Sequence, residues 1–173
     1  MRRAMSSSPK AALRPFLPAD ASTLAEIFQA AIEELTGDDY SEAQQAAWAA
    51  QADDAAAFGA RLAQNLTLVA TLEGAPVGFA SLKGNDRIEM LYVHPDAAGQ
   101  GVGALLYDAL EKLAAARKAA RLVADVSDTA EEFFRRRGFQ PQRRNSVPVG
   151  DEWLATTTME KRLASNDRGG QPA

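Results

Sequence analysis

One segment constrains the fold of this chain more than any other: a β-rich run that leads through alternate glycines into a helical pattern. Residues 87–93 read Arg-Ile-Glu-Met-Leu-Tyr-Val, and the loop after them contains Gly99, Gly101 and Gly103. From Leu105 onward, apolar residues recur at helical spacing and are expected to form one stripe of a long helix: Leu105, Leu106, Ala109, Leu110 and Leu113. Glycine allows positive φ angles and close approach of a ligand, and the free amides and dipole of a helix start attract anions. The segment therefore predicts a binding site for a phosphate or pyrophosphate group.

Two known glycine-loop folds are alternatives. A P-loop is excluded because no Lys-Ser/Thr pair follows the last glycine. A dinucleotide-binding Rossmann fold fits better, since residues 99–104 match G-x-G-x-x-G/A and Asp125 follows about 20 residues later. In that fold, however, the glycines come directly after the first strand, whereas residues 94–98 intervene here, and only one complete crossover unit remains downstream. We therefore favour a different phosphorylated cofactor.

The composition is that of an acidic globular protein. The chain has 173 residues, of which 46% are hydrophobic and 24% charged, with a formal net charge of −4. These values argue against wholesale disorder and against a nucleic-acid partner, which calls for a basic surface. They mildly favour cationic substrates by electrostatic steering.

Several chemistries are absent from the sequence. With no cysteine and a single histidine, His94, the chain cannot form disulfides or thiolate metal sites, has no cysteine nucleophile, and is expected to bind no metal. No run approaches the ~20 apolar residues that cross a bilayer, and no secretory signal pattern is present. We therefore expect a cytoplasmic protein without a membrane partner.

The chain divides into one predicted domain, residues 12–164, between disordered tails at residues 1–11 and 165–173. The periodicity predicts a three-layer α/β arrangement. Asp20 and Ser41 are expected to cap helices, and Thr129 with Glu132 to form a capping box. The expected helices cover residues 20–35, 41–51, 53–62, 102–118 and 129–138. The expected strands cover residues 12–16, 66–72, 76–82, 87–93, 121–126, 139–144 and 152–159.

The glycine segment resembles the GNAT superfamily of N-acetyltransferases. The family pattern Gln/Arg-x-x-Gly-x-Gly/Ala after a Leu-Tyr-Val-type strand end corresponds to residues 98–103 after residues 91–93. Residues 130–139 are similar to the family's Ala-x-x-x-Tyr-x-x-x-Gly-Phe, and residues 39–48 resemble its YafP-like branch. The resemblance extends from residue 13 to residue 163. It implies a GNAT-like α/β fold with a mixed, mostly antiparallel central sheet and helices on both faces.

The resemblance also implies a function: transfer of an acetyl group from acetyl-CoA to a primary amine of a small molecule or peptide by direct attack. Backbone groups of Leu91 and Val93 would pair with the pantetheine arm, and the loop amides would hold the pyrophosphate. Dimerisation is common in the family and stays open, as does the identity of the amine. The expected cofactor-binding residues are Leu91, Tyr92, Val93, Ala98, Gly99, Gln100, Gly101, Val102, Gly103 and Phe134.

The sequence departs from the family pattern at three positions. Ala98 replaces the usual Arg or Gln, so we expect weaker cofactor binding that rests on the backbone. Phe134 replaces the tyrosine that protonates the leaving thiolate, and Ser127 replaces a frequent asparagine. The first two departures keep open an alternative, a non-catalytic acyl-CoA-binding sensor.

The catalytic and acceptor residues are predicted from their places along the chain. An acceptor ammonium must lose a proton before it attacks, and Glu89 on the strand entering the site is the first candidate base. Asp125 on the facing strand is the second. Tyr40 and Trp48 are expected either to line the amine pocket or, in the case of Trp48, to pack on the core. We expect His94 at the surface or beside the pyrophosphate, and residues 135–137 on a solvated helix face, although one of these arginines could meet the 3′-phosphate of the cofactor.

Overall fold

A seven-stranded mixed sheet forms the centre of the protein. The computed structural model describes residues 10–164, so the tails predicted at residues 1–11 and 165–173 lie outside the described residues except for residues 10 and 11. The strand order is β1-β2-β3-β4-β5-β7-β6, and only the β4–β5 pair is parallel. This arrangement confirms the mostly antiparallel sheet and excludes a doubly wound parallel one. The strands are β1 Ala12–Pro15, β2 Leu66–Leu72, β3 Ala75–Lys83, β4 Arg87–Val93, β5 Arg121–Ser127, β6 Gln140–Val149 and β7 Glu152–Arg162.

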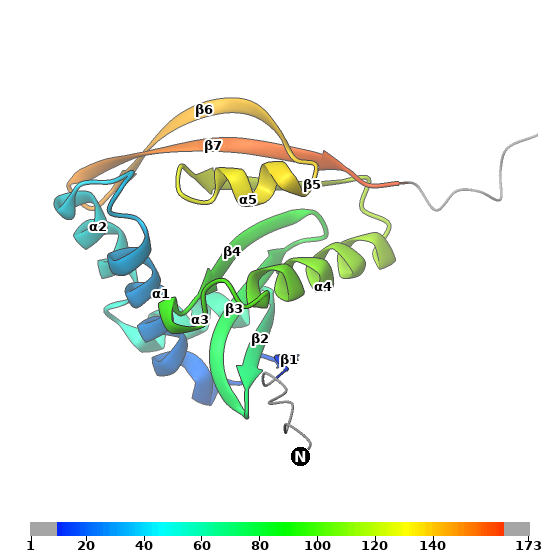
Figure 1. Cartoon of the computed structure of the whole chain (residues 1–173), viewed down its shortest axis with the longest axis horizontal. Coiled ribbons are helices and arrows are strands. Elements are labelled where there is room, and N and C mark those ends of the chain that lie inside the picture. Colours follow the sequence, from blue (N-terminus) through cyan, green and yellow to red (C-terminus); the bar gives the residue numbers. More distant parts are fainter. Residues whose placement is uncertain (1–9, 165–173) are drawn as a thin grey trace, which may run out of the picture.

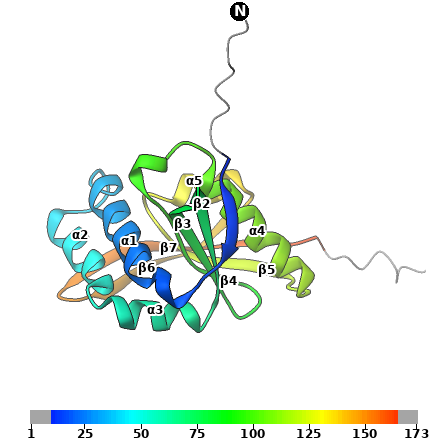
Figure 2. The same ribbon diagram turned by 90° about the horizontal axis from the view of Figure 1, so that it is seen from below.

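Helices cover both faces of the sheet, as predicted. Helices α1 to α3 lie on one face, and α4 and α5 on the other (Figures 1 and 2). None of the helices within residues 10–164 is both long and apolar enough to cross a membrane. The α-helices are α1 Ala21–Leu35, α2 Glu42–Ala49, α3 Ala55–Ala63, α4 Val102–Ala116 and α5 Glu131–Arg136. Short 3-10 turns occur at Pro18–Asp20, Ala50–Ala52 and Pro95–Ala97.

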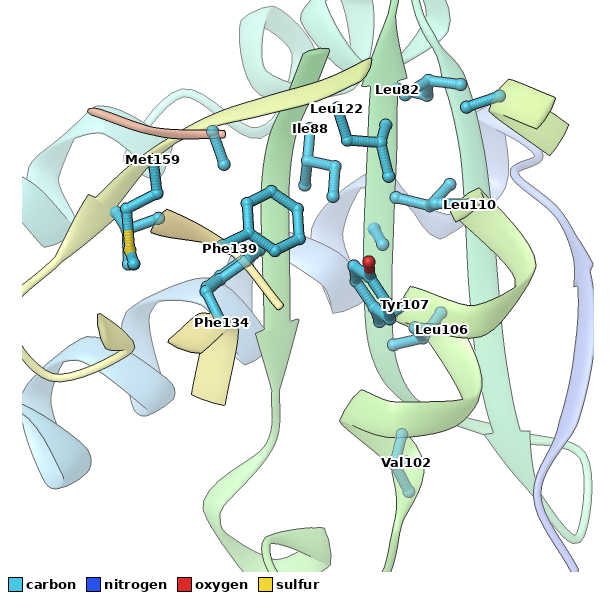
Figure 3. Close-up of a cluster of buried hydrophobic side chains, with 14 of the residues drawn as sticks. Leu82, Ile88, Val102, Leu106, Tyr107, Leu110, Leu122, Phe134, Phe139 and Met159 are labelled. Carbon is cyan, nitrogen blue, oxygen red and sulfur yellow. The ribbon is translucent and has the colours of Figure 1, made fainter. Parts of the chain in front are cut away.

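The core under α4 and α5 is mainly aliphatic, with the rings of Tyr107, Phe134 and Phe139 buried within it (Figure 3). The Tyr107 ring packs edge-on against Phe134 and Phe139, at centroid distances of 6.4 and 5.9 Å. The helical stripe predicted for α4 omitted Tyr107, which is 1% exposed, and included Leu105 and Leu113, which stay partly exposed. Helix α4 is therefore rotated relative to the prediction, because its aromatic side chain fills the space between α4 and α5.

The Ser41 cap is confirmed. The Gln44 amide donates to Ser41 Oγ at 3.1 Å, and the Ser41 amide donates back to Gln44 Oε1 at 2.9 Å. This reciprocal capping box satisfies two amides at the start of α2. Asp20 directly precedes α1, but the prediction that its side chain caps this helix is wrong. Its carboxylate instead accepts two 2.8 Å hydrogen bonds from Arg14, and these bonds lower the pKa of Asp20.

The predicted Thr129 capping box is also wrong. The Thr129 hydroxyl donates to Asp39 on the α1–α2 loop at 2.8 Å. The Ala130 amide donates instead to Ser127 Oγ at 3.2 Å, so the serine supplies the local turn contact before α5. The Thr129 hydroxyl thus bonds to a residue that is distant in the sequence, and a motif of neighbouring residues could not predict that contact.

The last two strands are longer than predicted. Strand β6 continues to Val149 and β7 begins at Glu152, so the hairpin reaches over α2 (Figure 1). At its turn, Gly150 adopts a φ of +57°. Leu154 and Val149 pack with Tyr40 beneath the hairpin. The hairpin thereby closes one end of the opening between β4 and β5.

Candidate functional site

Strands β4 and β5 separate soon after they begin. They pair only at Arg87 with Val123 and at Ile88 with Ala124. Beyond that point, no strand within residues 10–164 pairs with the β5-facing edge of β4. The His94 amide donates to Val77 on β3 at 2.7 Å. Because backbone groups alternate in direction along a strand, those of Leu91 and Val93 point into the opening.

A β-bulge at Glu89 sets the direction of this part of β4. Ser81 lies opposite Met90 and Leu82 opposite Ile88, which leaves Glu89 as an extra residue. Ile88 packs in the core under α4, whereas Met90, two residues later, packs in the core under α1. The bulge therefore reverses the alternation of the strand and turns Glu89 toward α3.

A cavity of about 540 Å³ lies at the opening. That volume suits a small ligand. It brings together seven of the residues predicted from the sequence, which come from four separate segments. These residues are Glu89, Asp125, Tyr40, Trp48, Leu91, Tyr92 and Phe134. The remaining predicted residues, Val93 and Ala98 to Gly103, do not line it and belong to the path from β4 to the start of α4.

The Glu89 carboxylate is held on the α3 side of the cavity. It accepts hydrogen bonds from Arg61 Nη2, at 3.3 Å, and from the side-chain amide of Asn65. Its side chain is 19% exposed, so solvent reaches it through the cavity. An oriented, accessible carboxylate can accept a proton from a bound ammonium directly or through one water.

Asp125 lines the same cavity, and its side chain is 50% exposed. Its carboxylate contacts Arg87 Nη1 at 3.2 Å and accepts a 2.6 Å hydrogen bond from Thr158. The Arg87–Asp125 pair thus spans β4 and β5 where the two strands begin to separate.

Tyr40 and Trp48 line the cavity at its hairpin end. The Tyr40 hydroxyl donates to the Ala155 carbonyl at 2.6 Å and accepts from the Asp128 amide at 2.9 Å. Trp48 packs edge-on against Tyr40, at 5.4 Å, and Tyr92, at 6.4 Å. Trp48 packs on two core clusters, as one of its two predicted roles requires, and it also faces the cavity.

The glycine loop leads directly into α4. Gly99 and Gly101 have φ angles of +78° and +82°, which L side chains rarely adopt. Helix α4 begins at Val102, so the amides of residues 102–104 have no acceptor inside the helix. A Cβ on Gly103 would lie 3.4 Å from the Phe133 ring. The loop thus presents free amides beside an aromatic ring.

The side chains near this loop have separate roles. His94 Nδ1 accepts the Asp96 amide at 3.1 Å, so it caps the Pro95–Ala97 turn. Arg135 and Arg136 form ion pairs along α5. Arg137 differs from the predicted solvated face: it is half-buried, with its guanidinium 3.7 Å from the Phe133 centroid. Among residues 10–164 it has no carboxylate partner.

Comparison with known proteins identifies the family. The profile of the acetyltransferase (GNAT) domain matches residues 36–163. The chain belongs to the GNAT acetyltransferase family. It is an acyltransferase by that membership. It is 33% identical over 147 residues to the uncharacterized N-acetyltransferase YafP of Escherichia coli K12, covering 85% of this chain and 93% of YafP. This match confirms the resemblance to the YafP-like branch.

Solved GNAT structures share the fold. A GCN5-related N-acetyltransferase from Rhodopseudomonas palustris has a TM-score of 0.87 at 60% identity, covering 94% of this chain and all of the other. The PaiA N-acetyltransferase of Thermoplasma acidophilum, solved with coenzyme A, has a TM-score of 0.71 at 18% identity, covering 89% and 99%. YncA of Salmonella typhimurium, solved with acetyl-CoA, has a TM-score of 0.63 at 22% identity, covering 95% and 98%.

Two of the three departures from the family sequence pattern are at Ala98 and Phe134. Ala98 is exposed and brings only a methyl group to the loop, while the neighbouring Gln100 donates to the Asp96 carbonyl at 3.3 Å. Phe134 is 5% exposed and lines the cavity with a ring that cannot donate a proton. The side chains of Ala98 and Phe134 therefore offer no hydrogen-bonding group.

Sequence reasoning missed the positive side of the cavity. Arg61, Lys83 and Arg87 all line it, as do apolar residues of the β6–β7 hairpin. Lys83 and Arg87 flank the predicted turn between two strands, so their opposition could have been inferred from that hairpin. Nothing in the sequence near Arg61 marks it, because α3 meets β4 only in the folded chain.

Proposed function

We propose that this GNAT domain transfers the acetyl group of acetyl-CoA to a primary amine of a small molecule or peptide, by direct attack of the amine. The observation that carries the proposal is the opening between β4 and β5. It connects the free amides at the start of α4, through the backbone edge of Leu91 and Val93, with the cavity that holds Glu89.

The residues present fit coenzyme A. The positive φ angles of Gly99 and Gly101 and the free amides at the start of α4 provide a backbone site for a pyrophosphate. The unpaired edge at Leu91 and Val93 provides hydrogen-bonding groups for the amides of a pantetheine arm. Arg137 supplies a cation beside Phe133, near the helix start.

Glu89 is the proposed general base. Acetyl-CoA supplies the activated acetyl group as a thioester. The Glu89 carboxylate accepts the proton that the acceptor ammonium must lose, while Arg61 and Asn65 hold the carboxylate in place. Asp125 is the second candidate, and its carboxylate is held by Arg87 and Thr158.

The thiolate leaves without a dedicated acid at position 134. Phe134 has no hydroxyl, and the Tyr40 hydroxyl already donates to a backbone carbonyl. A thiol with a pKa of roughly 8.5 is acidic enough to leave as the thiolate near neutral pH. The absence of cysteine from the chain fits direct attack, because no acyl-cysteine can form.

The test is amine-dependent release of thiol from acetyl-CoA across a panel of small amines and peptides, together with acetyl-CoA binding followed by thermal shift. We expect steady thiol release with at least one amine and a rise in melting temperature with acetyl-CoA but not NAD. Tight binding of acetyl-CoA with no turnover across the panel would contradict catalysis and support the alternative, a non-catalytic acyl-CoA sensor.

A further inference from the structure

The cavity carries an excess of positive charge. Three cationic side chains, Arg61, Lys83 and Arg87, line it together with two carboxylates, Glu89 and Asp125. The whole chain has a net charge of −4. The net charge of the residues that line the cavity is therefore opposite in sign to the net charge of the chain. The preference for cationic amines expected from the chain's net charge does not apply at the cavity.

Two of these cations directly face one another. Lys83 on β3 and Arg87 on β4 are register partners, so their side chains lie on the same face of the sheet. Like charges directly opposite destabilise a strand pair. Arg87 offsets part of this repulsion through Asp125, but Lys83 has no carboxylate or hydrogen-bond partner among residues 10–164.

The arginines also keep donors free. Arg61 contacts Glu89 through one nitrogen, at 3.3 Å, and Arg87 contacts Asp125 through one nitrogen, at 3.2 Å. Neither pair is bidentate, although a guanidinium carries five N–H donors. Both arginine side chains remain more than 40% exposed. The cavity therefore offers an anion several unused donors and one unpaired ammonium.

The side chains of Lys83 and Arg87 are close to the proposed base, Glu89. Glu89 is two residues beyond Arg87 on β4, a distance of about 6 to 7 Å along a strand. A ligand of a few bonds can thus place an anionic group against Lys83 and Arg87 and its amine against Glu89. Trp48, Tyr92 and Phe134 provide apolar wall for its carbon skeleton.

We propose that the acceptor is an amine that also carries an anionic group, a carboxylate or a phosphate, which Lys83 binds together with Arg87 and Arg61. This inference rests on the proposed function, because it names the acceptor class of the same cavity. Lys83 is the specificity determinant: it has no structural ion pair to lose, whereas each arginine also holds a carboxylate of the site.

Equilibrium binding to the CoA-saturated protein tests the proposal by calorimetry. Three matched pairs differ by the anionic group: phenylalanine and phenethylamine, 4-aminobutyrate and butylamine, and 2-aminoethyl phosphate and ethanolamine. We expect the anionic member of at least one pair to bind about tenfold more tightly or better, as charge-assisted hydrogen bonds would give. The first two pairs report a carboxylate ligand and the third a phosphate ligand.

Variants at Lys83 assign the preference to this residue. Lys83→Gln should remove most of the preference, and Lys83→Arg should retain it. Lys112→Gln changes an exposed lysine on α4 that does not line the cavity, and it should behave like the wild type. Melting temperatures of all three variants check that the fold is unchanged.

Three results would overturn the proposal: equal binding within every pair, preference for the uncharged or cationic member, or a preference that survives in Lys83→Gln. Because binding is measured without turnover, these results are separate from the thiol-release test. A chain that binds anionic amines but never acetylates them would contradict the proposed function and leave the acceptor class supported.

Discussion

At the scale of single residues, the bulge at Glu89 matters most, because one extra residue turns this carboxylate from the sheet toward α3. There Arg61 and Asn65 contact it beside the cavity. An ordinary alternating strand would place residue 89 on the same side as residue 91, against α4. The position of the candidate base is thus a consequence of backbone irregularity.

Replacing this carboxylate tests its role. We expect Glu89→Gln to lower kcat by about a hundredfold, since an amide cannot accept the ammonium proton, and to change the pH profile of kcat. Acetyl-CoA affinity should stay within about twofold of the wild type, because the predicted cofactor contacts lie elsewhere. Glu26→Gln, on the exposed face of α1, is the matched control. Unchanged steady-state kinetics in Glu89→Gln would remove Glu89 from the mechanism.

Arg137 is the second test at this scale. It directly follows α5, has no carboxylate partner in the described part of the chain, and stacks on Phe133 beside Gly103. We expect Arg137→Ala to weaken CoA binding about tenfold through loss of a phosphate contact. Arg136→Ala removes an exposed, paired arginine and should leave the calorimetric Kd unchanged. Equal Kd values for the two variants would show that Arg137 does not reach the cofactor.

At the scale of elements, the start of α4 depends on a residue in the left-handed region. Gly101 has a φ of +82° with nothing near its missing Cβ, and Gly84, in the β3–β4 turn, has a φ of +61° with equally open surroundings. An added methyl group at either position costs roughly 1–2 kcal/mol of backbone strain. The two glycines therefore form a matched pair that differs only in proximity to the proposed cofactor site.

We expect Gly101→Ala and Gly84→Ala to lower the melting temperature by similar amounts. Only Gly101→Ala should also weaken acetyl-CoA binding, because strain relief at residue 101 reorients the amides at the start of α4. Calorimetric Kd values and thermal unfolding of both variants provide the measurement. An equal change in affinity, or none, would mean that the loop conformation does not hold the cofactor.

The contact between the α1–α2 loop and the end of β5 also belongs to this scale. The buried Tyr40 hydroxyl joins the Asp128 amide to the Ala155 carbonyl. Tyr40→Phe keeps the ring but leaves both backbone groups without this partner, at an expected cost of about 1–3 kcal/mol in the free energy of unfolding. Urea denaturation measures the cost. A loss below about 0.5 kcal/mol would show that water replaces the hydroxyl.

At the scale of the whole molecule, the three tyrosines of the chain lie where the ionised phenolate is disfavoured: Tyr40 and Tyr107 are buried, and Tyr92 is partly buried beside the cavity. Burial raises the pKa of Tyr92 to about 12, and it also raises the pKa values of Tyr40 and Tyr107. The unfolded chain ionises its tyrosines near pH 10. Between these values the unfolded state holds fewer protons than the folded state, so stability falls as pH rises.

We expect no tyrosine of the folded protein to ionise with a midpoint at or below pH 10 when absorbance near 295 nm is followed. The same titration in concentrated urea should show midpoints near 10. The free energy of unfolding should decrease from about pH 10 upward, by on the order of 2 kcal/mol for Tyr92 alone by pH 12. A folded-state midpoint at 10 would contradict the burial of these phenols.

The sequence by itself determined the features that depend on neighbouring residues. Periodicity predicted the sequence of helices and strands, including β4 at residues 87–93, and the alternate glycines predicted a helix start with free amides. That segment predicted a phosphate or pyrophosphate ligand, and together with residues 130–139 it indicated the family by resemblance.

The tertiary structure alone decided the features that depend on which distant elements meet. The side chains of Asp20 and Thr129 do not cap helices as predicted, because they bond instead to Arg14 and Asp39. Tyr107 turned inward because α5 supplied aromatic rings around it. The positive side of the cavity arose because α3 and the β3–β4 pair place Arg61, Lys83 and Arg87 around the same space. Charges act through space, whereas helical and strand periods act along the chain. The glycine loop could therefore be predicted from the sequence, but the charges around the cavity could not.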